Sequence, residues 1–387
     1  MSLQLPFVKY LSRLLLCLSS CVVFSAIDSV LDSSPSSAAE QIIVRYGLFE
    51  QSLPVADLRK YAETRKASAD LKSFLHYINP KQQKMLQEAL QIKMPLDIAA
   101  LDKLLDTRLS KQLLFAASKG LARRDKAGVP ALRSAVILGA KSKEGLGIIS
   151  FLEAYPSNNL VVDLPAALEI LSRANLYTGS PNKQSQDNLS STLLWQQQVQ
   201  YQTFATTRKQ YSGCLFGDSI SAELGNTLGN GTFNFALNGL STISLVEQLK
   251  LLAPANVKCQ KAIIAVGGND ALYGLSKEQF SQKLVEAIAL TKKLGAQEIF
   301  LIPAFYSTVA ASQDPTVSAP LAKVEEINAV MNQVAATEKV PVESEGVQPL
   351  YENHVLKDNL TSDGDHLNAE GLKIYRQALF KILGIVN

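Results

Sequence analysis

The second half of the chain alternates between two hydrophobic patterns. Short, nearly continuous apolar runs, which are typical of buried strands, occur at residues 214–216, 232–237, 262–266 and 298–305. The segments between and after them carry apolar residues at helical spacing, at residues 276–295, 321–336 and 368–383. Strands that alternate with helices predict right-handed βαβ units, and therefore a mainly parallel sheet with helices on both faces. We expect this α/β domain to span residues 208–387.

The first half has a different pattern. One strand-like run at residues 41–46 is followed by successive segments with helical periodicity, and prolines stand near the start of several of them. We expect residues 40–177 to form a small, mainly α-helical domain. Residues 178–192 are polar and rich in chain-breaking residues, so residues 178–207 are expected to be a linker followed by a connecting helix.

The first 39 residues carry the pattern of an export signal. Lys9 and Arg13 precede an apolar run at residues 14–24, which is too short to span a bilayer comfortably. The small residues 37–39 offer a cleavage site. A bacterial lipoprotein box ending at Cys21 and an uncleaved anchor are the less favoured alternatives, and each would tether the protein to a membrane. All three predict an exported protein that is periplasmic, extracellular or envelope-associated.

Composition narrows the classes of function. The 387 residues are 47% hydrophobic and 19% charged, which suits two domains with buried cores. The formal net charge is only +3, and lysine and arginine do not cluster with aromatic residues, so the sequence argues against nucleic-acid binding. No spacing of cysteine and histidine suggests a zinc site. We expect neither a metal nor another cofactor.

The cysteines divide between the leader and the α/β domain. Two of the four lie in the leader, and the other two are Cys214 and Cys259. Exported proteins can form disulfides, but these two residues lie at different heights of the sheet if the strand ends align. We therefore expect two buried free thiols.

Four short polar segments stand at or just beyond the ends of predicted strands, or directly before the last helix. They occupy residues 217–219, 238–239, 267–270 and 363–366. In a doubly wound sheet such loops gather at one edge, so segments that are far apart in sequence can converge. The sequence therefore predicts a site assembled from all four loops.

Together these loops contain the groups that acyl transfer requires. Ser219 is the candidate nucleophile, His366 the candidate general base, and Asp363 the carboxylate that would orient the imidazole. The backbone N–H groups of Ser219 and Gly239 and the side-chain amide of Asn269 could hold the oxyanion of a tetrahedral intermediate. The pattern predicts a Ser-His-Asp triad with an oxyanion hole.

Other titratable residues near these segments are expected to be structural. Asp218 should brace the turn that carries Ser219, and Asp270 should brace its own loop. Asp365 is expected to face solvent or to cap the final helix. The remaining histidines, His76 and His354, are expected in the helical domain and in a surface loop.

The second half resembles the SGNH (GDSL-type) esterase and lipase superfamily. The resemblance rests on four sequence blocks in family order, at residues 217–221, 234–242, 267–270 and 363–367. It implies a flavodoxin-like sheet, Ser219, Asp363 and His366 as the triad, and Gly239 with Asn269 as oxyanion donors. No position in these blocks departs from the family pattern.

The first half resembles a helical domain of unknown function found at the start of exported cyanobacterial proteins labelled α/β-hydrolases. The resemblance rests on the small-residue cleavage region, the run at residues 39–47 and the helices that follow. It brings no catalytic residues. The Gly-x-Ser-x-Gly elbow of α/β-hydrolases is absent from the sequence.

These observations predict an exported serine esterase or lipase that hydrolyses acyl esters through an acyl-enzyme on Ser219. The substrate would be a small-molecule, lipid or polysaccharide ester. An O-acyltransferase or O-deacetylase acting on cell-envelope polysaccharide is an alternative, because the same triad serves both reactions. A non-catalytic, envelope-binding scaffold protein is an alternative from another class.

Overall fold

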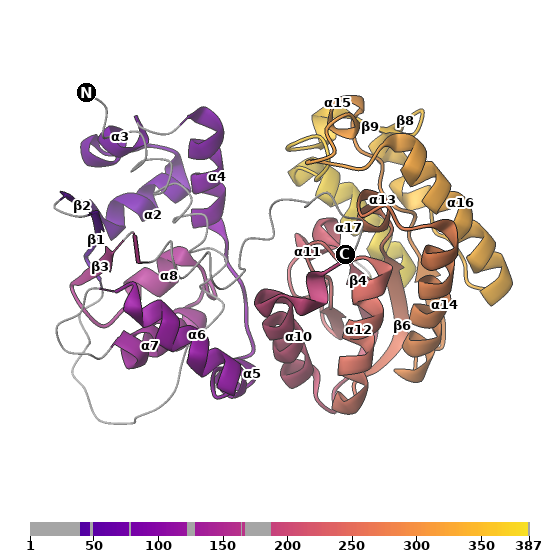
Figure 1. The fold of residues 1–387 in the computed structure, drawn as a ribbon, viewed down its shortest axis with the longest axis horizontal. Helices are drawn as coiled ribbons and strands as arrows, with labels where there is room; N and C mark the ends of the chain where they lie inside the picture. The colour runs from indigo at the N-terminus through magenta and orange to yellow at the C-terminus, as the bar shows by residue number, and fades with distance from the viewer. Residues whose placement is uncertain are drawn as a thin grey trace. The chain divides into compact units, whose positions relative to one another are not determined.

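The computed structural model forms two compact units, Met1–Tyr177 and Thr178–Asn387 (Figure 1). It describes residues 39–385 apart from 47–48, 77–78, 122–127, 164 and 167–186. All but the last residue of the predicted export signal at residues 1–39 therefore lie outside the described residues. Across the part of the chain that is described, no helix is both long enough and apolar enough to cross a membrane.

The first unit packs helices against a small sheet. Strand β1 (Gln41–Tyr46) is central, antiparallel to β2 (Phe49–Pro54) and parallel to β3 (Asn159–Asp163). Only β1 was expected, because β2 is half polar and β3 joins the sheet from more than a hundred residues away along the chain. The helices are α2 (Val55–Thr64), α3 (Ala69–Leu75), α4 (Pro80–Gln91), α5 (Ile98–Leu105), α6 (Arg108–Lys119), α7 (Gly128–Lys141) and α8 (Ile148–Glu153).

The second unit is built on a parallel sheet with the strand order β5-β4-β6-β7. The strands are β4 (Gln210–Gly217), β5 (Thr232–Asn234), β6 (Lys258–Ala265) and β7 (Glu298–Leu301). A parallel bridge from Leu301 to Val342 adds a fifth position beside β7. Numbered along the chain, the order is 2-1-3-4-5, which is the flavodoxin-like doubly wound arrangement. The predicted fold class is confirmed.

Two of these strands are shorter than the apolar runs that predicted them. β5 ends at Asn234, yet Phe235 N–H still donates to Leu215 O at 2.7 Å and Leu237 N–H to Gly217 O at 2.9 Å. The chain therefore follows β4 as far as the predicted end at residue 237. β7 stops at Leu301 because the chain then turns into a loop that pairs only through isolated contacts.

Helices cover both faces of this sheet. The longer ones are α10 (Leu193–Thr206), α12 (Thr242–Leu252), α14 (Lys277–Lys293), α16 (Leu321–Glu338) and α17 (Ala369–Leu383). Short turns of helix include η1 (Leu189–Ser191), α11 (Ser219–Ala222), α13 (Gly268–Leu272) and α15 (Val309–Ser312). The hairpin of β8 (Tyr351–Glu352) and β9 (Val355–Leu356) precedes α17.

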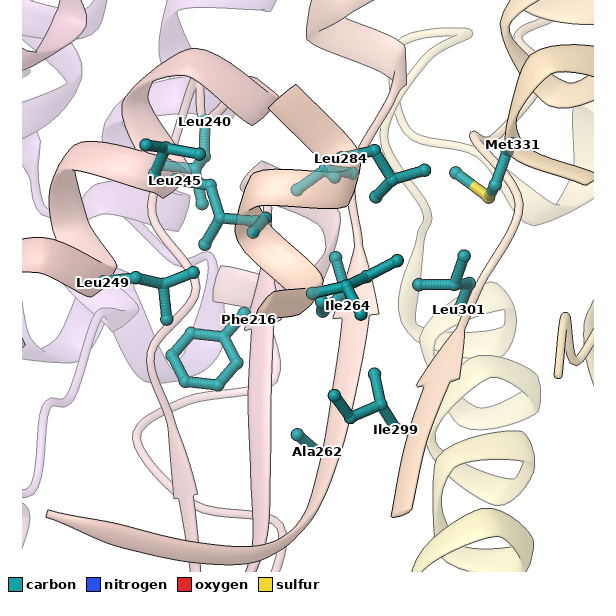
Figure 2. Packing of buried hydrophobic residues seen from close by; sticks show 14 of the residues in the cluster. Phe216, Leu240, Leu245, Leu249, Ala262, Ile264, Leu284, Ile299, Leu301 and Met331 are labelled. Carbon is teal, nitrogen blue, oxygen red and sulfur yellow. The ribbon is translucent and has the colours of Figure 1, made fainter. Parts of the chain in front are cut away.

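Successive side chains of the central strands face two separate cores, as a pleated strand requires. Phe216 and Ile264 lie in one core with leucines of α12 and α14 (Figure 2). Leu215 and Ile263 lie in the other, together with Tyr375 of α17. Because both faces are buried, the strands read as continuous apolar runs, which made them recognisable from sequence.

The helix expected as a connector belongs to the first of these cores. Trp195 and Val199 of α10 are 2% and 1% exposed and pack with the sheet residues. Gln202 of the same helix donates to Phe235 O at 3.2 Å. α10 is therefore part of the second unit and supports the chain that follows β5.

The expectation of two free thiols is wrong, because Cys214 and Cys259 form a disulfide with their Cα atoms 5.8 Å apart. The prediction assumed that the strand ends align, which places the two cysteines at different heights of the sheet. In the structure Cys259 pairs with Tyr211, and Cys214 pairs with Ala262. The register, however, has no pair between Ser212 and Gln260. Both cysteines face the same core, although regular alternation would place Cys259 on the opposite face of the sheet from Ala262, so the pleat is irregular at this point.

Candidate active site

Ser219 lies on a tight turn between the central strand and a helix. β4 ends at Gly217, and α11 begins at Ser219. Asp218 caps this helix, and its carboxylate accepts a hydrogen bond from Ile220 N–H at 3.2 Å. The expected bracing role of Asp218 is thus seen directly. The serine stands at the carboxyl edge of the sheet, where doubly wound folds bind ligands.

A hydrogen bond between two buried hydroxyl groups, those of Ser221 and Tyr375, stabilises this turn. Ser221 Oγ lies 2.8 Å from the hydroxyl of Tyr375 in α17, and both residues are fully buried. A Cβ atom at position 217 would collide with the Ser221 side chain. Glycine is therefore required at position 217 by close packing.

The last loop brings His366 to the serine. His366 Nε2 lies 2.9 Å from Ser219 Oγ, and His366 Nδ1 lies 2.9 Å from Asp363 Oδ2. Asp363 Oδ1 also accepts the backbone N–H groups of His366 and Asp365, at 2.8 and 3.0 Å. The three residues thus form a continuous hydrogen-bonded chain.

This arrangement raises the pKa of His366 and lowers the pKa of Asp363. The hydrogen bond to Asp363 raises the pKa of His366 to about 9, although burial works against it. Burial alone would raise the pKa of Asp363, but the hydrogen bonds from the His366 ring and from the two backbone N–H groups outweigh it and lower the pKa. Asp363 therefore stays ionised across the neutral range and favours a protonated His366.

The loop after β5 places Gly239 beside the loop after β6. Gly239 has φ of 77°, a backbone conformation that suits glycine. Its carbonyl accepts a hydrogen bond from the Tyr273 hydroxyl at 3.0 Å. The Asn269 side-chain Nδ2 donates to Leu240 O at 3.3 Å. Since Nδ2 carries two hydrogens, this bond orients the amide and leaves a second donor.

Asp270 connects the same two loops. It is fully buried, and its carboxylate accepts a hydrogen bond from Thr242 N–H at 3.0 Å, at the start of α12. We expected Asp270 to brace its own loop, and the structure shows that its carboxylate braces the neighbouring loop at Thr242. Burial raises the pKa of Asp270 to about 7.

Of two further carboxylates near the histidine, Asp218 is buried and Asp365 is half-buried. Burial, and then the charge of Asp365, raise the pKa of Asp218 to about 7. Burial also raises the pKa of Asp365, which bonds to Ser318. Asp365 is half-buried, and the alternative that it caps the last helix is wrong, because Asn368 caps that helix by accepting from the N–H groups at the helix start.

The other histidines lie apart from this chain of hydrogen bonds. His354 sits at the tip of the β8–β9 hairpin, 64% exposed, and its Nδ1 is 3.2 Å from a Glu325 carboxylate oxygen. His76 ends α3 in the first unit. Among the described residues, no group of histidine, cysteine and acidic side chains could hold a metal ion.

Some supporting contacts carry no sequence pattern. The Tyr273 bond to Gly239 and the Tyr375 bond to Ser221 join residues that are 34 and 154 positions apart. Neither tyrosine stands in a recognisable motif, and only the folded sheet brings them to these partners.

Comparison with solved structures found several of low similarity. One is a putative acylhydrolase from Bacteroides fragilis, 19% identical over 44% of this chain and 86% of that chain, with a TM-score of 0.37. Another is a GDSL-like lipase from Bacteroides thetaiotaomicron, 18% identical over 46% and 88%, with a TM-score of 0.38. A third is a catalytic mutant of an acetylxylan esterase from Geobacillus stearothermophilus, 16% identical over 46% and 94%, with a TM-score of 0.37.

Sequence families give a firmer assignment. The chain has no significant match among curated proteins. Residues 38–163 match the family described as alpha/beta hydrolase of unknown function (DUF1400). Residues 213–374 match the GDSL-like Lipase/Acylhydrolase family, a match that includes Ser219, Gly239, Asn269, Asp363 and His366. The second unit thus carries a GDSL-like lipase/acylhydrolase domain, and the protein is an ester-hydrolysing enzyme.

Proposed function

We propose that this chain is an exported serine esterase in which Ser219, His366 and Asp363 act as a catalytic triad. The observation that carries the proposal is the unbroken hydrogen-bonded chain from serine to carboxylate, with both links at 2.9 Å. Its substrates are acyl esters of small alcohols, lipids or polysaccharides.

In the first half of the reaction, neutral His366 takes the proton of Ser219 Oγ as that oxygen bonds to the ester carbonyl carbon. The carbonyl oxygen becomes an alkoxide. His366 then gives its proton to the leaving alcohol oxygen as the C–O bond breaks, which leaves an acyl-enzyme. Water repeats these steps with His366 as base, and the acid leaves as Ser219 recovers its proton.

Three donors would hold the alkoxide: the N–H groups of Ser219 and Gly239 and the side-chain amide of Asn269. Within the described residues, neither of these two N–H groups donates to a protein acceptor. Ser219 also begins a helix, where free N–H groups favour negative charge. Both observations support an oxyanion role.

Export is supported by two independent features. The leader pattern at residues 1–39 is that of a secretory signal. The Cys214–Cys259 disulfide suits an oxidising compartment, because such bonds rarely persist in the cytosol. Locating the processed protein in cell fractions, and sequencing its N-terminus, tests this part of the proposal.

The nucleophile is tested by labelling with a fluorophosphonate probe. Wild-type protein should be labelled and should hydrolyse a short-chain aryl ester, and Ser219→Ala should do neither. Ser212→Ala is the matched control, because Ser212 is exposed near the opposite end of the same strand. Undiminished labelling of Ser219→Ala would reject the triad. Adding a sugar acceptor to the assay shows whether the acyl group passes to water or to a hydroxyl.

A further inference from the structure

A short segment ahead of α10 packs against the loop that carries Gly239. It comprises Asp187 and η1 (Leu189–Ser191), and it lies outside the residues that match the esterase family. A Cβ atom at Gly239 would lie 3.8 Å from both terminal methyl groups of Leu189. The segment therefore touches the loop directly.

Asp187 makes the strongest contacts of this segment. One carboxylate oxygen accepts the hydroxyl of Ser241 at 2.6 Å and the backbone N–H of Ser244 at 3.1 Å. The other accepts Leu189 N–H at 2.8 Å. Ser241 is the N-cap of the eleven-residue helix α12. A carboxylate is favoured there, because it accepts otherwise free donors and faces the positive end of the helix dipole.

Three consecutive residues of this loop, Gly239 to Ser241, thus accept hydrogen bonds from, or donate them to, residues outside the loop. Tyr273 bonds the carbonyl of Gly239 at 3.0 Å, and Asn269 bonds that of Leu240 at 3.3 Å. Asp187 bonds the side chain of Ser241. Tyr273 and Asn269 come from the segment around α13. Only Asp187 comes from the chain before the sheet.

We propose that Asp187 is a positioning residue for the oxyanion-binding loop. By fixing Ser241 and the first turn of α12, it sets the direction of the Gly239 N–H two residues earlier. The inference rests on the proposed function, since it requires Gly239 to be an oxyanion donor. Asp187 acts through Ser241 and not on the substrate.

The loss of Asp187 should affect the reaction rate and not substrate binding, because the oxyanion is absent from the bound substrate and forms only during the reaction. The alkoxide forms only on the way to the acyl-enzyme, so a misdirected N–H weakens the transition state and leaves substrate binding unchanged. Loss of Asp187 should lower kcat by about tenfold, with KM within about twofold of wild type. The pH dependence of kcat/KM should keep its midpoint, because Asp187 does not act through His366.

The experiment compares Asp187→Asn with Asn188→Ala in the full-length enzyme. Asp187→Asn keeps the size of the side chain but removes the charge and one acceptor. Asn188 is exposed and adjacent in sequence, so its substitution should leave kcat unchanged. Each kcat is divided by the fraction of enzyme that a fluorophosphonate labels at completion, which corrects for any unfolded protein.

A double-mutant cycle separates positioning from general stabilisation. If Asp187 acts through Ser241, Ser241→Ala should also lower kcat, and the double variant should lose little more than either single variant. If Asp187 only stabilises the fold, Asp187→Asn should lower the melting temperature while kcat per labelled site stays within about twofold of wild type. That result, or a shifted pH midpoint, would overturn the proposal.

Failure of this inference is distinct from failure of the proposed function. Were Ser219→Ala still labelled, the triad would be wrong whatever Asp187 does. Were Ser219→Ala inert and Asp187→Asn fully active, the triad would stand and the role of Asp187 would fall.

Discussion

Asp363 holds His366 by the ring and by the backbone at once. The bond to Nδ1 selects the tautomer with a free Nε2 when the ring is neutral, and the bond to the His366 N–H fixes the loop that presents it. The same carboxylate stabilises the protonated ring. The proton on His366 therefore determines how activity depends on pH.

The enzyme should be more active in alkaline than in neutral solution. Catalysis needs a neutral imidazole, and the pKa of His366 is raised to about 9, so activity should increase as pH rises through that value. A profile of kcat/KM against pH for a short-chain ester, corrected for spontaneous hydrolysis, measures the midpoint. A flat profile from neutral pH to about pH 9 would contradict the role of His366 as base.

Asp363→Asn should separate the two effects of the carboxylate. The maximal rate should fall by about 10²–10⁴-fold, because the ring loses its orientation and its compensating charge. The midpoint of the pH profile should move to lower pH, because the main cause of the raised His366 pKa is gone. An unchanged midpoint with a reduced rate would show that another group sets the pH dependence.

Asn269→Ala should slow acylation by about 10²–10³-fold if the amide binds the oxyanion. Single-turnover acylation with a chromogenic ester measures the step directly. Asn332→Ala, on an exposed position of α16, serves as the control. A loss below about tenfold would show that the backbone donors suffice.

Among individual residues, the sequence predicted the candidate site residues that stand in recognisable motifs. It missed the supporting residues that stand in none. Ser219, Asp363 and His366 could be proposed because each follows a strand end or precedes a helix start. Asp187 and Tyr273 could not, because their partners Ser241 and Gly239 are reached only through the fold.

Among the elements, β4 and β6 matter most to the site. Ser219 follows the first and Asn269 the second, and the Cys214–Cys259 bond links the two strands within the core. The apolar runs predicted both strands and their parallel pairing. The missing pair between Ser212 and Gln260 could not be predicted, because pleat irregularities depend on how neighbouring strands pack.

Removing this disulfide should destabilise the second unit. The bond closes a loop with a sequence separation of 45, and loss of a native bond of this kind costs about 2–5 kcal/mol. Urea denaturation of wild type with and without reductant measures the change. The Cys214→Ala/Cys259→Ala variant is the matched control and should not respond to reductant. Equal stability of oxidised and reduced wild type would argue against the bond.

At the scale of the whole molecule, the folded esterase unit begins earlier in the chain than the family match does. Residues 187–206 pack into the core and onto the loop at Gly239 although the family match begins at residue 213. Composition and patterning predicted a mainly helical first half and an α/β second half. They did not assign α10, whose amphipathic pattern is weak because core and buried amide contacts surround it.

A fragment that starts before Asp187 should therefore be more stable than a fragment that starts after α10. Residues 178–387 should hydrolyse esters, and residues 208–387 should be less stable, because removing Trp195 and Val199 exposes the core beneath α10. Thermal melting and ester turnover of both fragments measure the difference. Equal stability of the two fragments would show that α10 is dispensable.

The pairing of Ser221 with Tyr375 has a consequence for when activity arises. Ser219 is synthesised 147 residues before His366, and Ser221 is synthesised 154 residues before Tyr375. A chain that ends before His366 has a serine with neither a base beside it nor the hydroxyl that supports its turn. Under the proposed mechanism, ester cleavage therefore requires that the chain be synthesised at least as far as His366 and Tyr375.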